Sequence, residues 1–121
     1  MEFNIGMDGD IVILGLTGDL VASSIEEFKL QVSKLTDKNF VNIMLDMSKV
    51  GFMDSSGLGS CIAVHKMLTG KDGMIVFAQP NDSVNKIFRI TMADKKLNIA
   101  LSKSEGIKKF HEKIISERRQ K

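Results

Sequence analysis

The chain has 121 residues, of which 43% are hydrophobic and 26% charged, and its formal net charge is +2. This size and balance are typical of one globular domain with its own core, so we expect a single domain over residues 1–121. Every apolar run is far shorter than the ~20 residues that a membrane-spanning helix needs, so we expect no integral membrane protein.

The N-terminus and the cysteine content both favour a cytoplasmic location. Residues 1–5 lack the basic segment followed by an apolar segment that marks a secretory signal. Cys61 is the only cysteine, so no disulfide can form within the chain.

Positive charge is concentrated near the C-terminus, where residues 103–121 hold seven basic and three acidic residues. A basic tail can contact nucleic acid or an anionic surface, or it can be the solvated face of a helix. Ile107, Phe110 and Ile114 recur at helical spacing, and acidic residues are interspersed among the basic ones. We therefore favour the solvated helix and expect no direct binding of nucleic acid.

The chain begins with an expected β-hairpin. Two β-rich runs, residues 2–7 and 10–17, are separated by Asp8-Gly9, a dipeptide suited to the positive φ angles of a tight turn.

An amphipathic helix is expected over residues 20–35. Ser23 and Glu26 have the spacing of a capping box at its start. Its apolar face consists of Ile25, Phe28, Val32 and Leu35.

A strand–helix–strand crossover follows. Residues 41–45 and 74–78 are nearly continuous apolar runs, as expected of strands that are covered on both faces. Between them, residues 58–68 keep helical spacing, and residues 69–73 supply the stop and the turn. A parallel pairing of the two strands would have a right-handed crossover.

The C-terminal third predicts a short helix, a weak strand and a last helix. Val84, Ile87, Phe88 and Thr91 mark the short helix, and the strand is expected over residues 97–100. Ser102 and Glu105 form a second capping-box pattern before the last helix. The whole order of elements predicts an α/β fold with a mixed sheet.

The segment 46–59 is the most informative for function. It leads from an apolar strand into a helix, where Asp54, Ser55 and Ser56 compete for the N-cap and the first amides favour an anion. Gly57 and Gly59 cost a helix roughly 1 kcal/mol each relative to alanine. Two reasons for these glycines stay open, the close approach of a partner and tight packing against the sheet.

Enzyme signatures are incomplete in this segment. No glycine stands two residues before Ser56, as a nucleophile elbow requires, and the glycines at 57 and 59 lack the lysine of a phosphate-binding loop. Asp46 and Asp54 suggest the acidic, magnesium-binding pocket of a receiver domain. The adjacent acidic pair and the late lysine that a receiver domain also has are missing from this sequence.

Metal and thiol chemistry are not expected either. Cys61, His65 and His111 do not have metal-ligand spacing. A thiol–imidazole pair of Cys61 and His65 on one helical face is conceivable, but a core or boundary histidine is the simpler interpretation. We expect no enzyme, no cofactor and no metal.

The octapeptide Phe52-Met53-Asp54-Ser55-Ser56-Gly57-Leu58-Gly59 closely resembles the signature of bacterial anti-sigma factor antagonists, which are STAS domain proteins. The resemblance covers essentially the whole chain, because Gly18-Asp19-Leu20, an Asp46 that ends the third strand and the helix over 84–88 also match. It implies a STAS-type mixed sheet with an N-terminal hairpin, covered by about four helices.

The resemblance also implies a function. In this family the serine after the signature aspartate, here Ser55, is phosphorylated by a serine kinase that is also the anti-sigma factor. The unphosphorylated protein binds that anti-sigma factor and releases a sigma factor, and a PP2C-type phosphatase restores this form. The resemblance thus implies a switchable, cytoplasmic binding module that regulates transcription as a monomer or weak homodimer.

By the same resemblance, the partner-binding surface joins the loop after the hairpin to the start of the signature helix. Many family members have an acidic residue where this chain has Val21, a departure that affects this loop. The expected partner-binding residues are Asp19, Leu20, Val21, Ser23, Ser24, Asp54, Ser56, Gly57, Leu58 and Gly59.

Two other functions stay open at this stage. One is a non-phosphorylated STAS scaffold subunit of a transport or sensory complex. The other is a small-ligand or enzyme domain that uses the strand-to-helix loop as an anion site.

Overall fold

The structure is a computed structural model that describes residues 1–119. Its elements, in chain order, are β1 (Glu2–Asp8), β2 (Ile11–Thr17), α1 (Ile25–Asp37), β3 (Asn42–Lys49), α2 (Ser55–Thr69), β4 (Met74–Ala78), α3 (Asp82–Ile90), the 3-10 helix η1 (Ala93–Lys95), β5 (Asn98–Ala100) and α4 (Lys103–Arg119).

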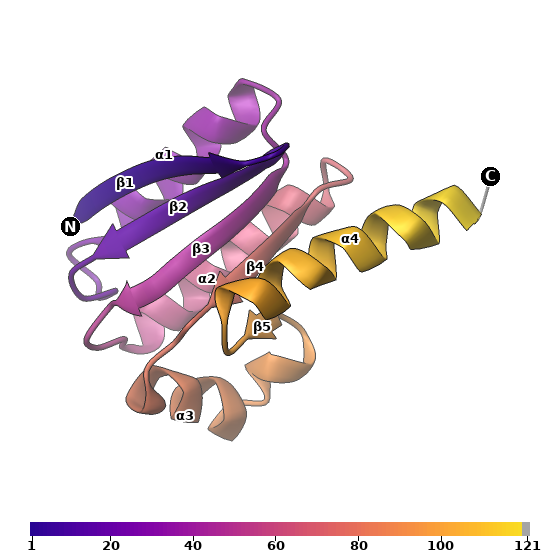
Figure 1. The fold of residues 1–121 in the computed structure, drawn as a ribbon. Helices are drawn as coiled ribbons and strands as arrows, with labels where there is room; N and C mark the ends of the chain where they lie inside the picture. Colours follow the sequence, from indigo (N-terminus) through magenta and orange to yellow (C-terminus); the bar gives the residue numbers. More distant parts are fainter. Residues whose placement is uncertain (120–121) are drawn as a thin grey trace.

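The strands form one mixed sheet in the order β1-β2-β3-β4-β5 (Figure 1). β1 pairs antiparallel with β2, and each later neighbour pairs in parallel. Parallel neighbours need a crossover, and the helices between the strands supply it. The α/β class, the mixed sheet and the N-terminal hairpin are therefore confirmed.

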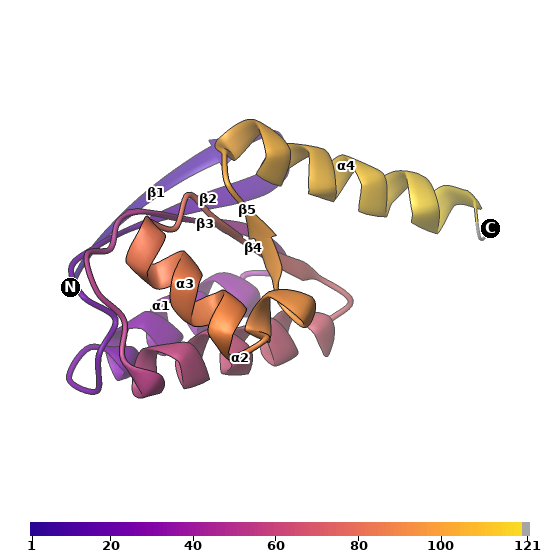
Figure 2. The ribbon, with the colours of Figure 1, turned by 90° about the horizontal axis from the view of Figure 1, so that it is seen from below.

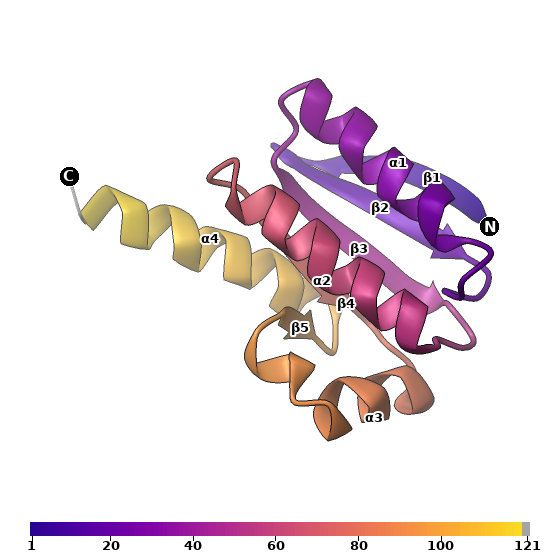
Figure 3. The same ribbon diagram turned by 180° about the vertical axis from the view of Figure 1, so that it is seen from behind.

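Helices cover both faces of this sheet. Figure 3 shows α1 and α2 side by side on one face, with α3 beside them at the β5 end. Seen edge-on in Figure 2, α4 lies on the opposite face. The larger core fills the space under α1, α2 and α3 and includes Phe28, Phe77 and Phe88, whereas the smaller core under α4 includes Met44 and Phe110.

The C-terminal helix begins as its capping pattern predicts. The Ser102 hydroxyl accepts a hydrogen bond from the Glu105 amide, and the Glu105 carboxylate accepts one from the Leu101 amide, both at 3.2 Å. Phe110 is buried against the sheet, while Ile114 is 40% exposed. The later turns of α4 extend past the sheet (Figure 1). Helical spacing in the basic tail is thus confirmed.

Two turns differ from expectation. The hairpin turn is Gly9-Asp10, one residue later than expected, because Asp8 still pairs with Ile11 and Gly9 takes the positive φ of 58°. In addition, α1 begins at Ile25 instead of residue 20.

The first capping-box prediction is wrong. Ser23 is exposed and makes no capping bond, and the N-cap position belongs to Ser24. The Ser24 hydroxyl accepts a hydrogen bond from the Val21 amide at 3.1 Å and donates to the Asp19 carbonyl at 2.7 Å. These bonds fold residues 19–24 into a turn, so the helix cannot start earlier.

Asp46 lies within β3 and does not end it, because pairing with β2 continues to Lys49 after a register shift. Its carboxylate accepts a hydrogen bond from the Ser48 amide at 3.0 Å and forms a 3.2 Å ion pair with Lys103 at the start of α4. Partial burial acts to raise the pKa of Asp46, but the hydrogen bonds from Ser48 and the ion pair with Lys103 outweigh it and leave this pKa below its ordinary value. Asp46 therefore ties α4 to the sheet.

This ion pair predicts a pH-dependent loss of stability. A carboxyl with a lowered pKa stabilises the fold above its ordinary pKa of 3.8, and that contribution disappears as pH falls through the lower folded-state pKa. Asp46→Asn should lower the free energy of unfolding by about 0.5–1 kcal/mol at pH 7, since Lys103 is half exposed. Urea unfolding at stepwise lower pH should show the variant and the wild type converging below pH 3.8. A constant difference at every pH would contradict this role.

Candidate functional site

Residues 52–59, the signature segment, lead from the loop after β3 into α2. Of the three candidate capping residues, Asp54 is the N-cap of α2. Its Oδ1 accepts a hydrogen bond from the Gly57 amide at 2.9 Å. Ser55 is then the first helical residue and is exposed, while Ser56 is half-buried. The serine that follows the cap therefore lies open to solvent at the helix start.

The loop after β2 lies directly beside the signature segment. The Leu20 amide donates to the Phe52 carbonyl at 3.0 Å, and the Asp54 amide donates to the Leu20 carbonyl at 3.2 Å. The Asp54 Oδ2 atom accepts a further, 3.3 Å bond from the Ala22 amide. One carboxylate thus caps α2 and holds the neighbouring loop, so residues 19–24 stay close to Ser55.

The two glycines of α2 have different reasons for being glycine. A Cβ atom at Gly57 would overlap the Leu20 carbonyl and lie 2.7 Å from the Met53 side chain. A Cβ atom at Gly59 would meet nothing within 4 Å, and Gly59 is exposed. Tight packing inside the protein therefore explains why residue 57 is glycine. It does not explain Gly59, which leaves open space on the surface of the protein.

The expected partner-binding residues divide by exposure. Those exposed are Asp19, Ser23 and Gly59; those half-buried are Val21, Asp54, Ser56 and Leu58; those buried are Leu20, Ser24 and Gly57. All of them belong to the two adjoining segments described above. The buried ones position the surface through the contacts just given, and the others form it.

Two further residues belong to this region. Phe52 is 51% exposed beside the loop, and its carbonyl accepts the hydrogen bond from the Leu20 amide. Asn81 caps α3 by accepting a bond from the Val84 amide at 2.9 Å, and its side-chain amide donates to the Val50 and Gly51 carbonyls at 3.1 and 3.2 Å. The sequence marks Asn81 as a turn residue but contains no signal for this long-range brace.

The thiol–imidazole interpretation finds no support in the geometry. Cys61 is fully buried, and burial, only partly offset by a hydrogen bond with Ser60, raises the pKa of its thiol to about 12. Among residues 1–119, no hydrogen bond joins Cys61 to His65. The thiol is thus protonated at neutral pH and a poor nucleophile.

Residues 1–119 contain no group of three or more His, Cys, Asp or Glu side chains placed to hold a metal ion. None of the helices within that range combines the length and the apolar character required to cross a bilayer.

The cap predicts a measurable loss of stability. Asp54→Ala removes the acceptor for both the Gly57 and the Ala22 amides, so we expect the free energy of unfolding to fall by about 1–2 kcal/mol. Asp54→Asn keeps a capping oxygen and should cost much less. Equal losses for the two variants in urea unfolding would show that the charge, and not the cap, stabilises this corner.

The chain is similar to known proteins over most of its length. Residues 3–106 match the STAS domain. A protein of Thermotoga maritima named "Putative anti-sigma factor antagonist" is 27% identical over 105 residues, which cover 86% of this chain and 93% of that protein.

Solved structures agree with this match. A crystal structure of a Thermotoga maritima protein of the same name superposes with a TM-score of 0.83 at 26% identity, covering 88% of this chain and 92% of the other. The anti-sigma factor antagonist SpoIIAA shares the fold in its unphosphorylated form, with a TM-score of 0.67, 20% identity and coverage of 91% and 98%. SpoIIAA from Bacillus in its phosphorylated form superposes with a TM-score of 0.66 at 22% identity, covering 90% of this chain and 99% of the other. The chain belongs to the STAS domain family, and its distant relatives in that family bear the name of anti-sigma factor antagonists.

Proposed function

We propose that this protein is an anti-sigma factor antagonist whose binding to an anti-sigma factor is switched by phosphorylation of Ser55. The observation that carries the proposal is the position of Ser55, which is exposed directly after the Asp54 cap and beside the loop 19–24. A kinase can reach this hydroxyl, and a partner that covers it also contacts both segments. Ser56 is half-buried and is the less accessible of the two serines.

A phosphate on Ser55 is compatible with the fold. Phosphoserine adds roughly −1.5 to −2 charge, and a helix N-terminus favours an anion. Within residues 1–119, the backbone amides of Ser55 and Ser56 donate no hydrogen bond, whereas the Gly57 amide is taken by Asp54. Phosphorylation therefore adds charge to a site with free donors and without a buried clash.

The switch then acts on the interface. Asp54, directly before Ser55, already brings a carboxylate to this surface, and Asp19 in the adjoining loop is exposed, so a phosphate on Ser55 concentrates negative charge here. A partner shaped for a neutral hydroxyl would have to desolvate that charge without compensation. The unmodified protein binds, and the phosphorylated protein is released.

The proposed function implies which proteins bind or modify this chain. The anti-sigma factor is also the serine kinase, a PP2C-type phosphatase returns the protein to its binding form, and the freed sigma factor joins RNA polymerase in the cytoplasm. The protein itself is a binding module that catalyses no reaction. What supports this assignment is membership of the STAS family together with an intact Asp54-Ser55-Ser56 sequence.

The acceptor can be tested by incubating the protein with its cognate kinase and ATP and locating phosphate by mass spectrometry. We expect one phosphate, at Ser55, which Ser55→Ala abolishes and Ser56→Ala leaves intact. Phosphate at Ser56, or none at all under conditions in which the kinase is active, would contradict the proposal. The second of these outcomes would favour the non-phosphorylated scaffold.

A further inference from the structure

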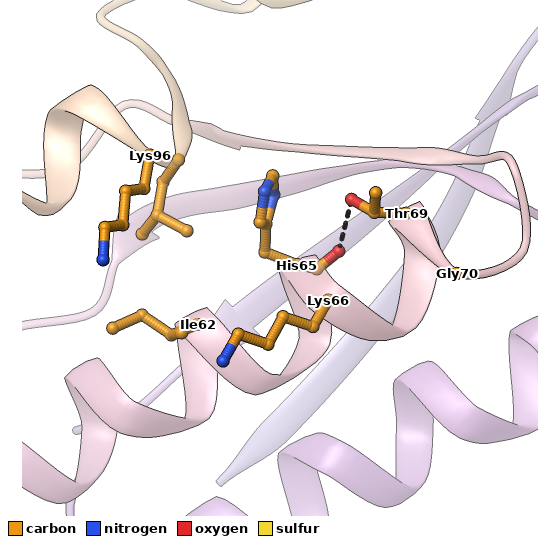
Figure 4. Close-up of a pocket in the computed structure, with 7 residues that line it drawn as sticks. Ile62, His65, Lys66, Thr69, Gly70 and Lys96 are labelled. Carbon is orange, nitrogen blue, oxygen red and sulfur yellow. Dashed lines mark hydrogen bonds between the residues drawn. The ribbon is translucent and has the colours of Figure 1, made fainter.

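A cavity of about 600 Å³ opens at the other end of α2, away from the signature segment. It lies between the last turns of α2 and the segment that joins η1 to β5 (Figure 4). Its lining includes Ile62, His65, Lys66, Thr69, Lys96 and Leu97. With a rise of 1.5 Å per helical residue, its centre is roughly 15 Å from Ser55, so it is separate from the partner surface.

The walls of this cavity are mainly apolar. Leu97 is buried on one side, and Ile62 is half-buried on the α2 side. The His65 ring also lines the cavity, and its Nδ1 atom is buried and has no hydrogen-bond partner among residues 1–119. An apolar ligand group can displace water from such walls favourably, because burial of apolar surface drives association in water.

The charged groups on the rim have one sign. Lys66 comes from α2 and Lys96 follows η1, so the cavity separates the two elements that supply the ammonium groups (Figure 4). Neither lysine forms a salt bridge with any partner in residues 1–119, and no acidic side chain lines the cavity. Thr69 donates its hydroxyl hydrogen to the His65 carbonyl at 2.9 Å and keeps lone pairs free. The rim therefore favours an anion.

We propose that this cavity binds a small amphipathic anion, with a short apolar body against Ile62 and Leu97 and an anionic head between Lys66 and Lys96. Its volume is within the ~300–1,000 Å³ of ordinary small-molecule sites. A carboxylate and a phosphate monoester satisfy the same two ammonium groups. These ligands share an anionic head, and an experiment can distinguish a carboxylate head from a phosphate head.

The test is an NMR titration of the isotopically labelled protein with octanoate, octyl phosphate and, as a neutral control of the same chain length, 1-octanol. We expect saturable amide shifts around His65 and Leu97 with at least one of the two anions, and at least tenfold weaker binding of octanol. Whichever anion binds more tightly identifies the head group. Absence of saturable shifts with both anions, or equal affinity for octanol, would overturn the proposal.

Two double variants that remove the same amount of charge test whether the anion binds in this cavity. Lys66→Ala with Lys96→Ala should weaken anion binding at least tenfold. Lys34→Ala with Lys38→Ala removes the same charge from exposed positions at the end of α1 and should leave the affinity unchanged. Equal losses in the two pairs would show binding through net charge alone and overturn the proposal. The titration contains no partner protein, so its result is independent of the switch at Ser55.

Discussion

Replacing Gly57 by alanine should lower the free energy of unfolding by about 3 kcal/mol, although alanine is the better helix former. The added Cβ would overlap the backbone carbonyl of Leu20 and press on the Met53 side chain. Leu20 is fully buried and is hydrogen-bonded to the signature segment, so its carbonyl cannot move without displacing the loop. The strain must therefore fall on the contact between α2 and residues 19–24.

Gly59→Ala is the matched control for this variant. It makes the same chemical change two residues later in the same helix, where a Cβ atom meets nothing within 4 Å. Relief of the glycine penalty should raise stability by about 0.5–1 kcal/mol. Urea or thermal unfolding of both variants would separate the two effects. If Gly57→Ala were as stable as Gly59→Ala, the close contact with Leu20 would not exist as described.

The second large effect concerns binding. Ser55→Asp should weaken binding to the anti-sigma factor substantially, and true phosphorylation should weaken it about a hundredfold, which corresponds to ~2.8 kcal/mol. Ser55→Ala should bind like the wild type, because it adds no charge. Calorimetric titration of each variant with the anti-sigma factor measures these affinities, and circular dichroism checks that the fold is retained.

A charge control makes this result specific to the surface. Ser104 is exposed in the first turn of α4, so Ser104→Asp places the same charge at a comparable helix position on the opposite face of the sheet. Its affinity should equal that of the wild type. A similar loss in Ser55→Asp and Ser104→Asp would mean that overall charge controls binding and that the surface around Ser55 does not.

Local sequence signals predicted most of the fold. The strand over residues 74–78 matches β4, because an apolar run is bounded by Gly73 and followed by Pro80. The start of α4 follows from its cap, in which the Ser102 hydroxyl accepts a hydrogen bond from the Glu105 amide three residues later. Such features depend on neighbours in the chain, so a sequence pattern contains all the information they need.

The site depends on contacts that no local pattern contains. Ser23 and Glu26 have capping-box spacing, yet Ser24 folds the loop by bonding to Asp19 and Val21. The reason for Gly57 becomes visible only when Leu20, 37 positions earlier in the sequence, lies against it. The Ser24 turn is local but competes with the capping-box pattern. The Gly57 contact depends on the pairing of two distant loops, which follows from the order of the strands in the sheet.

The most direct test of the proposed switch compares the binding of two forms of the same protein to the proposed partner, an anti-sigma factor. One form is unmodified, and the other carries a single phosphate at Ser55, verified by mass spectrometry. We predict about a hundredfold lower affinity for the phosphorylated form, with an unchanged amide NMR spectrum outside the neighbourhood of the signature segment and residues 19–24. Equal affinities of the two forms, or a phosphorylated form that has lost its fold, would contradict a switch that acts at the interface.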